Sequence, residues 1–341
     1  MTKVLLTGGS GFIAAHILEI LLQRGHEVIT TVRSEDKAAQ IRNAHPNAPL
    51  TVVIVPDIVK PNAFDSVVSA PGLEAVIHTA SPFHFNYTDA KTELLDPALI
   101  GTTSILKAIK DLARRVKRVV ITSSFASMLS EKTLADPTTI FTEANWNPST
   151  YEDGLRGDKV KAYRTSKTIA EKAAWKFLDD NKPNFDLAAI CPPLVFGPVA
   201  HHLESLSSIN TSNQRFVDVI RGGWKQHIPE TGTYLWVDVR DVARAHVLAT
   251  EKPAAGGPRF FLTAGRFTNR DLADAVRKNF PELGGKLPAS DVQGGGYHEE
   301  GIYGYDNSKA SKELGIDWIS LEQSAVDTVK SVIGDRHVAR I

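Results

Sequence analysis

The segment Thr7-Gly8-Gly9-Ser10-Gly11-Phe12-Ile13-Ala14 joins a short apolar run, Lys3 to Thr7, to a longer run with helical spacing, Phe12 to Gly25. Small residues at positions 8, 11 and 14 give it the pattern G-x-x-G-x-x-A. Between a strand and a helix, the first glycine permits a tight turn, the second lets the backbone approach a pyrophosphate, and the third small residue lets the helix pack on the strand. The helix N-terminus then faces the negative charge. The segment therefore predicts a dinucleotide-binding loop at the start of an α/β fold.

Short β-branched runs alternate with long amphipathic runs through the first half of the chain. We expect strands at Lys3 to Thr7, Glu27 to Val32, Leu50 to Val55, Glu74 to Thr79, Val116 to Thr122 and Phe185 to Cys191, and helices at Phe12 to Gly25, Ser34 to Ala44, Asn62 to Ser69, Asp89 to Ala113 and Val160 to Asn181. Such alternation predicts βαβ units and a parallel sheet, and strands that are nearly all apolar are typical of a sheet covered on both faces. The predicted fold class is α/β, a Rossmann-like doubly wound parallel sheet with a smaller, mostly C-terminal substrate-binding lobe.

The pattern loosens after Pro192-Pro193, where glycine, proline and aromatic residues are scattered. We expect residues 1–190 to form the dinucleotide-binding domain and residues 191–341 to form most of the substrate-binding lobe. The segment at about 234–250 is the exception, because it reads as a strand and a helix that return to the main sheet. The domain boundary is therefore expected to be discontinuous.

The composition favours a globular protein with a small-molecule partner. Of 341 residues, 42% are hydrophobic and 23% charged, and 39 basic residues balance 39 acidic ones, so no net field attracts nucleic acid or an anionic membrane. Cys191 is the single cysteine, which fits a reducing compartment, and no run resembles a signal peptide or a membrane span. We expect a cytoplasmic protein. The end Ala339-Arg340-Ile341 loosely resembles a Ser-Lys-Leu peroxisomal signal, but an ordinary solvated tail explains it as well.

The residue after the second expected strand indicates which dinucleotide binds. Enzymes that use NAD tend to carry Asp or Glu there to hold the ribose 2′-hydroxyl, whereas this chain has Arg33, followed by Lys37. A guanidinium matches a 2′-phosphate, so NADP is favoured over NAD. The alternative is that both cations belong to a solvated helix start. Asp57, after the third strand, is placed to accept from the adenine amino group or to cap a turn.

Three polar residues point to hydride chemistry at a carbonyl. Tyr163 and Lys167 are four apart on an expected helix and therefore share a face. A nearby ammonium is expected to lower the tyrosine pKa and make Tyr163 a usable proton donor. Ser124 ends the fifth strand at the edge where such sheets bind ligands, so its hydroxyl can hold a carbonyl oxygen. Ser123 is the weaker candidate because alternation turns its side chain away.

Several motifs together carry a family resemblance. They are the loop Thr7 to Ala14, the run His78-Thr79-Ala80-Ser81-Pro82-Phe83, Thr122-Ser123-Ser124, the Tyr163/Lys167 helix continuing to Glu171-Lys172-Ala173-Ala174-Trp175, Pro192 to Pro198, and Val237-Asp238-Val239-Arg240-Asp241-Val242-Ala243. Over nearly its whole length the chain resembles the extended short-chain dehydrogenases/reductases. Within them it is most similar to fungal NADPH-dependent aldehyde and ketone reductases of the methylglyoxal reductase type, relatives of dihydroflavonol and cinnamoyl-CoA reductases.

The resemblance implies a Ser124-Tyr163-Lys167 triad, reduction of aldehydes, α-dicarbonyls or ketones, and hydride delivery from the B face of NADPH. It also implies cofactor contacts from Arg33, Lys37, Asp57, Thr79 and Val195. The full set of residues expected at the cofactor adds Gly8, Ser10, Gly11, Phe12, Ile13, Ile58, Ala80, Tyr163, Lys167 and Pro192. Members of the family occur as monomers and dimers, so we expect a monomer or a homodimer.

Two stretches depart from the family pattern. Many extended members carry an asparagine just before the glycine at Gly101 that completes a proton relay to the lysine, and this chain has Ile100 there. The cinnamoyl-CoA branch carries an asparagine-tryptophan-tyrosine-cysteine run, where this chain has Asn145-Trp146-Asn147-Pro148. The second departure argues against a coenzyme A thioester as substrate.

The substrate pocket is expected to be apolar and aromatic. Phe83, Phe85, Phe125 and Leu194 follow strands at the binding edge, although some of them belong equally well to the core. His201-His202 lacks a third ligand at a suitable spacing, so no metal is assigned.

Two other functions remain possible on the sequence. One is a nucleotide-sugar epimerase or dehydratase, which Arg33 and the absence of carboxylates beside Ser124 disfavour. The other is a non-catalytic NADP sensor that regulates a partner, which has no need of Ser124, Tyr163 and Lys167 together.

Overall fold

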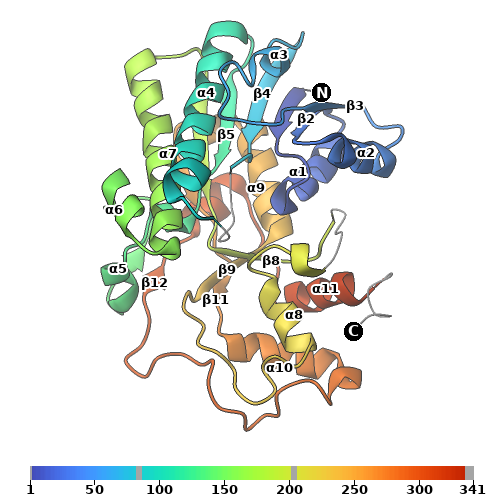
Figure 1. The fold of residues 1–341 in the computed structure, drawn as a ribbon, viewed down its shortest axis with the longest axis vertical. Coiled ribbons are helices and arrows are strands. Elements are labelled where there is room, and N and C mark those ends of the chain that lie inside the picture. Colours follow the sequence, from blue (N-terminus) through green and yellow to red (C-terminus); the bar gives the residue numbers. More distant parts are fainter. Residues whose placement is uncertain (1, 82–86, 201–205, 335–341) are drawn as a thin grey trace.

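A parallel sheet covered by helices forms the upper part of the molecule, and a smaller group of strands and helices lies beneath it (Figure 1). The computed structural model describes residues 2–81, 87–200 and 206–334. Within these residues the main sheet has seven strands in the order β10-β7-β5-β4-β1-β2-β3, all paired in parallel. The strands are β1 (Lys3–Thr7), β2 (Glu27–Val32), β3 (Leu50–Ile54), β4 (Leu73–His78), β5 (Arg118–Thr122), β7 (Asp186–Cys191) and β10 (Arg259–Phe261). The predicted fold class is confirmed.

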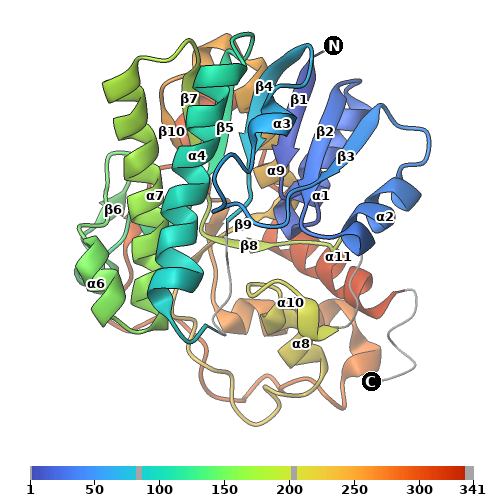
Figure 2. The same ribbon diagram turned by 45° about the horizontal axis from the view of Figure 1, so that its top comes forward.

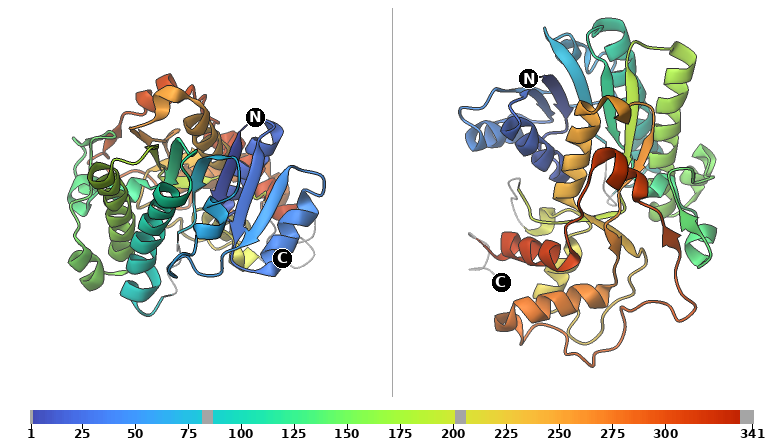
Figure 3. Two further views of the ribbon diagram at one scale, coloured as in Figure 1. Left: turned by 90° about the horizontal axis from the view of Figure 1, so that it is seen from above. Right: turned by 180° about the vertical axis from the view of Figure 1, so that it is seen from behind.

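Both faces of this sheet are buried under helices. One face carries α1 (Phe12–Gln23), α2 (Glu35–Ala44) and α9 (Val239–Glu251), and the other carries α3 (Asp65–Val68), α4 (Asp96–Leu112) and α7 (Lys159–Asn181). Seen from behind, α9 runs beside α1, and seen from above the helices stand on both sides of the strands (Figure 3). Alternation along β1 sends Val4 and Leu6 into one core and Leu5 into the other. Because successive side chains enter opposite cores, a strand of this sheet needs apolar residues at consecutive positions.

The smaller part packs against the carboxyl ends of the main strands (Figure 2). It contains the sheet β11-β9-β8 and the helices α8, α10 and α11. Their bounds are β8 (Leu194–Phe196), β9 (Leu235–Asp238), β11 (Gly265–Arg266), α8 (Gln214–Ile220), α10 (Asn269–Asn279) and α11 (Leu321–Ile333). A short pair, β6 (Ile140–Phe141) and β12 (Gly304–Tyr305), and two short helices, α5 (Glu131–Ala135) and α6 (Tyr151–Arg156), complete the edge beside α7.

The expectation that Tyr234 to Thr250 returns to the main sheet is wrong for its strand. β9 pairs with β8 and β11 in the smaller sheet, while the place beside β7 in the main sheet is taken by β10. Asp238 ends β9 and caps α9 by accepting from the backbone N–H of Arg240 at 2.8 Å, so the chain turns at once into the helix. Only α9 covers the main sheet as expected.

The helix expected from Asp89 to Ala113 is divided. A π-helical turn, Lys91–Leu95, precedes α4, and Pro97 lies in the first turn of α4. Proline has no N–H to give to the carbonyl four residues earlier, which interrupts the regular helical ladder at this point.

Candidate functional site

The order of the main sheet reverses between β1 and β4, and open α/β sheets bind ligands outside the carboxyl ends of the strands at such a point. The loop after β1 contains the glycine pattern. Gly8 has φ +75°, in the left-handed region that favours glycine, and a Cβ there would lie 3.1 Å from both Ala80 Cα and Thr79 Oγ1. A Cβ on Gly9 would lie 2.0 Å from Thr30 Oγ1. Any larger residue at position 8 or 9 would therefore collide with adjacent segments of the same chain, so both positions require glycine.

The start of α1 is open to a ligand. Gly11 is its N-cap, no side chain caps it, and Gly11 N–H donates to Gly8 O at 2.9 Å. Ala14 is buried against the main core, as the third small position requires. Ser10, Phe12 and Ile13 lie around this helix start and are partly exposed. The loop thus offers backbone N–H groups and a helix dipole to an anion.

Thr7 joins this loop to the one that follows β4. Its hydroxyl bonds with His78 Nδ1 at 2.8 Å and accepts from the backbone N–H groups of Thr79 at 3.2 Å and Ala80 at 3.1 Å. Thr79 Oγ1 donates back to Thr7 O at 2.5 Å. The predicted contact residues Thr79 and Ala80 are therefore held against Gly8.

The residues expected at the far end of the cofactor surround the end of β2. Arg33 follows β2, is exposed, and makes no hydrogen bond or ion pair with any of the described residues. Ser34 caps α2 by accepting from the backbone N–H of Lys37, which places Lys37 in the first turn beside Arg33. Asp57 does cap a turn, since its Oδ1 accepts from Val59 N–H at 3.0 Å, and neighbouring Ile58 packs toward Gly101. A basic pair at a sheet edge suits a 2′-phosphate.

Ser124 and Tyr163 meet at the end of β5. Ser124 is the N-cap of a short 3-10 turn, Phe125–Ser127, where its Oγ accepts from Ala126 N–H at 3.1 Å. The side chains of Ser124 and Tyr163 lie near each other, and the serine hydroxyl acts to lower the pKa of the phenol. Lys167, one turn further along α7, donates to the carbonyl oxygen of Thr122 at 3.4 Å. The three residues predicted to be catalytic are thus brought to one place.

Burial determines the protonation of this group. Burial raises the pKa of Tyr163, and the nearby hydroxyl of Ser124 opposes the rise. The expectation that the ammonium of Lys167 lowers this pKa finds no support, because the two influences on the Tyr163 pKa are burial and the Ser124 hydroxyl. Burial also lowers the pKa of Lys167 to about 8, although the electrostatic influence of Cys191 and Glu171 counteracts it. At neutral pH the site therefore holds a protonated phenol beside an ammonium group.

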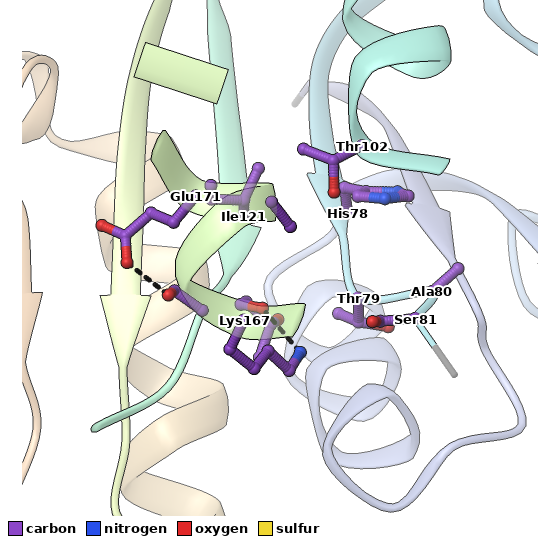
Figure 4. A pocket seen from close by; sticks show the side chains of 11 residues that line it. His78, Thr79, Ala80, Ser81, Thr102, Ile121, Lys167 and Glu171 are labelled. Atoms are coloured by element: carbon purple, nitrogen blue, oxygen red, sulfur yellow. Dashed lines mark hydrogen bonds between the residues drawn. The ribbon is translucent and has the colours of Figure 1, made fainter. Parts of the chain in front are cut away.

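A small cavity of about 20 Å³ lies behind Lys167, lined by His78, Thr79, Ala80, Ser81, Thr102, Ile121, Thr122, Ser123, Lys167, Ala170 and Glu171 (Figure 4). It is large enough for a single water. His78 borders it, and burial and the nearby Lys167 charge lower the pKa of His78 to about 3, so this ring is neutral.

The remaining predicted residues have different surroundings. Pro192 is buried, and its carbonyl oxygen accepts from Phe125 N–H at 2.8 Å. Val195 is buried in the main core, and Leu194 is partly buried against the core of the smaller part. Phe125 is 2% exposed and packs against the rings of Phe141 and Phe261, so its surroundings fit the core alternative. Phe83, Phe85, His201, His202 and the C-terminal tripeptide lie outside the described residues.

The sequence analysis missed a buried charged pair beside the serines. Glu171 and Arg259 form an ion pair of 2.6 Å with side chains 1% and 8% exposed. Two signals were available: Tyr163, Lys167 and Glu171 recur every four residues, and Arg259 opens an otherwise apolar run.

Among the described residues there is no group of three or more His, Cys, Asp or Glu side chains arranged to hold a metal ion. In the same part of the chain, no helix combines the length and the apolar character that a membrane crossing requires.

A glycine loop at the switch point, with serine, tyrosine and lysine beside it, defines a dinucleotide-dependent enzyme of the doubly wound class. The chain belongs to the NAD dependent epimerase/dehydratase family, which it matches over residues 4–262. It is 46% identical to the ketoreductase azaE of Aspergillus niger, with 97% of each chain covered. It is 38% identical to the NADPH-dependent methylglyoxal reductase GRE2 of Saccharomyces cerevisiae, over 97% of this chain and 98% of the relative. The crystal structure of yeast methylglyoxal/isovaleraldehyde reductase Gre2 complexed with NADPH superimposes with a TM-score of 0.88 at 36% identity, covering 97% of this chain and 98% of that one.

Proposed function

We propose that the protein is an NADPH-dependent carbonyl reductase that converts aldehydes, α-dicarbonyls or ketones to alcohols. The observation that carries the proposal is the approach of Ser124 to Tyr163, with Lys167 one turn away, at the edge that the glycine loop opens to a dinucleotide. Similarity to a ketoreductase and to methylglyoxal reductases supports the same reaction.

The residues present fit NADPH. The uncapped start of α1 would hold the pyrophosphate, and Arg33 with Lys37 would hold the 2′-phosphate. When bound, NADPH supplies the hydride that the carbonyl carbon accepts.

Tyr163, Ser124 and Lys167 each have a separate role in the reaction. Tyr163 donates its phenolic proton to the carbonyl oxygen, and Ser124 donates a hydrogen bond to the same oxygen as negative charge develops there. The raised pKa of Tyr163 suits this direction, because a donor must still carry its proton at working pH. Lys167 stabilises the phenolate that remains after transfer.

The smaller part of the chain, mostly from residues 191–341, supplies the substrate-binding lobe in this proposal, with residues 1–190 as the NADP-binding domain. Leu194 at the start of β8, together with Phe83 and Phe85, would give the pocket apolar character. The protein acts as a monomer or homodimer in the cytoplasm.

Consumption of NADPH, followed by its absorbance, tests the function over methylglyoxal, aliphatic aldehydes, diketones and aryl ketones, with NADH as control. Turnover with NADPH supports the reductase. Tight NADPH binding without any turnover would refute it and point to a sensor or to a nucleotide-sugar substrate.

Replacing Arg33 by serine should raise KM for NADPH about 10- to 100-fold, because charge-assisted hydrogen bonds contribute about 1.5–3 kcal/mol each. KM for NADH should change little. Arg42→Ser on the following helix, α2, where Arg42 is paired with Glu35, is the matched control. Equal changes for both cofactors would show that Arg33 does not recognise the phosphate.

The rate of reduction should fall as pH rises through about 8. Lys167 has a lowered pKa of about 8, so its ammonium is present below that pH and lost above it, while the raised pKa of Tyr163 keeps the phenol protonated. A profile of kcat against pH measures this decrease, which forms the alkaline limb of the profile. Lys167→Arg places a guanidinium that does not titrate in this range, so the limb near pH 8 should vanish; a limb that persists would assign it to another group.

A further inference from the structure

The carboxylate of Glu171, buried behind the site, accepts hydrogen bonds from residues on both sides of Ser124. Glu171 is 1% exposed and lies one turn beyond Lys167 on α7. Its Oε2 accepts from Ser123 Oγ at 2.5 Å and from Ser127 Oγ at 2.7 Å. Its Oε1 accepts from Trp175 Nε1 at 3.2 Å. The dashed line at Glu171 in Figure 4 marks the bond with Ser123.

The two serines bracket the catalytic one. Ser123 directly precedes Ser124, and its backbone N–H donates to Ile190 O at 2.8 Å, which anchors it to β7. Ser127 closes the 3-10 turn, since its N–H donates to Ser124 O at 2.9 Å and its Oγ lies 2.8 Å from the same oxygen. The carboxylate of Glu171 therefore fixes the chain before and after Ser124.

Arg259 neutralises this carboxylate and is itself held rigidly. Its Nη1 donates to the carbonyl oxygens of Glu143 and Asn145, each at 2.7 Å, and its Nη2 donates to Ser127 Oγ at 3.0 Å. The guanidinium carbon lies 3.7 Å from the centre of the Trp146 ring. With every donor group engaged, the guanidinium can hold Glu171 in a single orientation.

We propose that Glu171 and Arg259 are a positioning pair that fixes the turn 123–127 and thereby aims the Ser124 hydroxyl at the substrate carbonyl oxygen. The inference rests on the proposed function. Neither residue touches substrate; both act through Ser124. A hydroxyl that is aimed before the reaction stabilises developing charge without reorganising, and misplacement by about 1 Å costs up to about 100-fold in rate.

The opposite end of β5 supplies a matched control. There Arg118 pairs with Asp186, and its guanidinium also donates to the carbonyl oxygens of Ala249, Lys252 and Pro253. This second pair likewise ties a strand of the main sheet to its surroundings, but it lies at the amino ends of β5 and β7, away from Ser124. Asp186→Asn should therefore affect stability and leave kcat unchanged.

The test is a double-mutant cycle of Glu171→Gln with Ser124→Ala, assayed with methylglyoxal and isovaleraldehyde. Measurement at pH 6.5, below the pKa of about 8 of Lys167, keeps that ammonium charged in every variant. We expect Glu171→Gln to lower kcat about 10- to 100-fold with KM for NADPH unchanged. In the Ser124→Ala background the same change should lower kcat less than about twofold, because the group that it positions is gone.

Thermal melting confirms that each variant is folded at the assay temperature. Should Glu171→Gln fail to fold, Ser127→Ala removes a single bond of the network and replaces it in the cycle. An equal loss of kcat in both backgrounds, or an unchanged kcat, overturns the inference. No NADPH turnover by the wild-type protein would refute the proposed function and this inference with it, whereas turnover that Glu171→Gln leaves intact refutes the inference alone.

Discussion

Replacing Tyr163 by phenylalanine is expected to lower kcat for carbonyl reduction by about 10²- to 10⁴-fold, because the variant lacks the proton donor. The ring is kept, so the packing of α7 against its neighbours should survive. The lost hydroxyl also removes the interaction with Ser124, but that serine still accepts from Ala126 N–H at 3.1 Å. Affinity for NADPH should be nearly unchanged, since the glycine loop and Arg33 are untouched.

Steady-state reduction of methylglyoxal, together with titration of NADPH by fluorescence, separates these two effects. Tyr151→Phe is the matched control: it makes the same chemical change on α6, where the hydroxyl of Tyr151 donates to Asp96 at 2.5 Å. It should retain full activity. A Tyr163→Phe protein that still reduces methylglyoxal at a normal rate would exclude Tyr163 as the proton donor.

Sequence patterns predicted the main sheet well because of what its strands must bury. β1 and β2 begin and end at the expected residues, since both faces of each strand are covered and charged residues occur only at their first positions. The strand order reverses between β1 and β4, which are neighbours in the sheet, and the predicted glycine loop lies at this point. The meeting of Ser124 and Tyr163 followed from two local rules, that strand ends share an edge and that residues four apart share a helical face.

The features that escaped prediction depend on contacts between distant segments. β10 has three residues, too few to show a period, and its first residue, Arg259, is charged. Only the fold shows that Glu171 lies opposite and makes this arginine tolerable in a buried strand. β9 likewise has four buried residues that would suit either sheet, and its partners β8 and β11 are themselves short. Phe125 was ambiguous for a related reason, because its position after a strand end suits a pocket, whereas its stacked neighbour Phe261 comes from far along the chain.

The same buried pair leads to the largest stability effect that we expect. Replacing Arg259 by methionine should lower the free energy of unfolding by about 3–5 kcal/mol, because it leaves the carboxylate of Glu171 buried without its counter-ion. Lys176→Met on α7 removes the partner of Asp180 in a pair whose side chains are 75% and 54% exposed, and should change the same quantity by about 0–0.5 kcal/mol.

Urea denaturation followed by circular dichroism measures both variants. Removing both charges with Glu171→Met and Arg259→Met should recover part of the loss, since a buried apolar pair needs no counter-ion. Recovery should stay incomplete, because the hydroxyls of Ser123 and Ser127 and the indole N–H of Trp175 would lose their acceptor. An Arg259→Met protein within 1 kcal/mol of wild type, roughly the effect of an exposed pair, would mean that water reaches Glu171 and that the pair is not a buried one. The positioning role would then lose its physical basis, because a solvated carboxylate has no reason to hold the turn 123–127 in a single conformation.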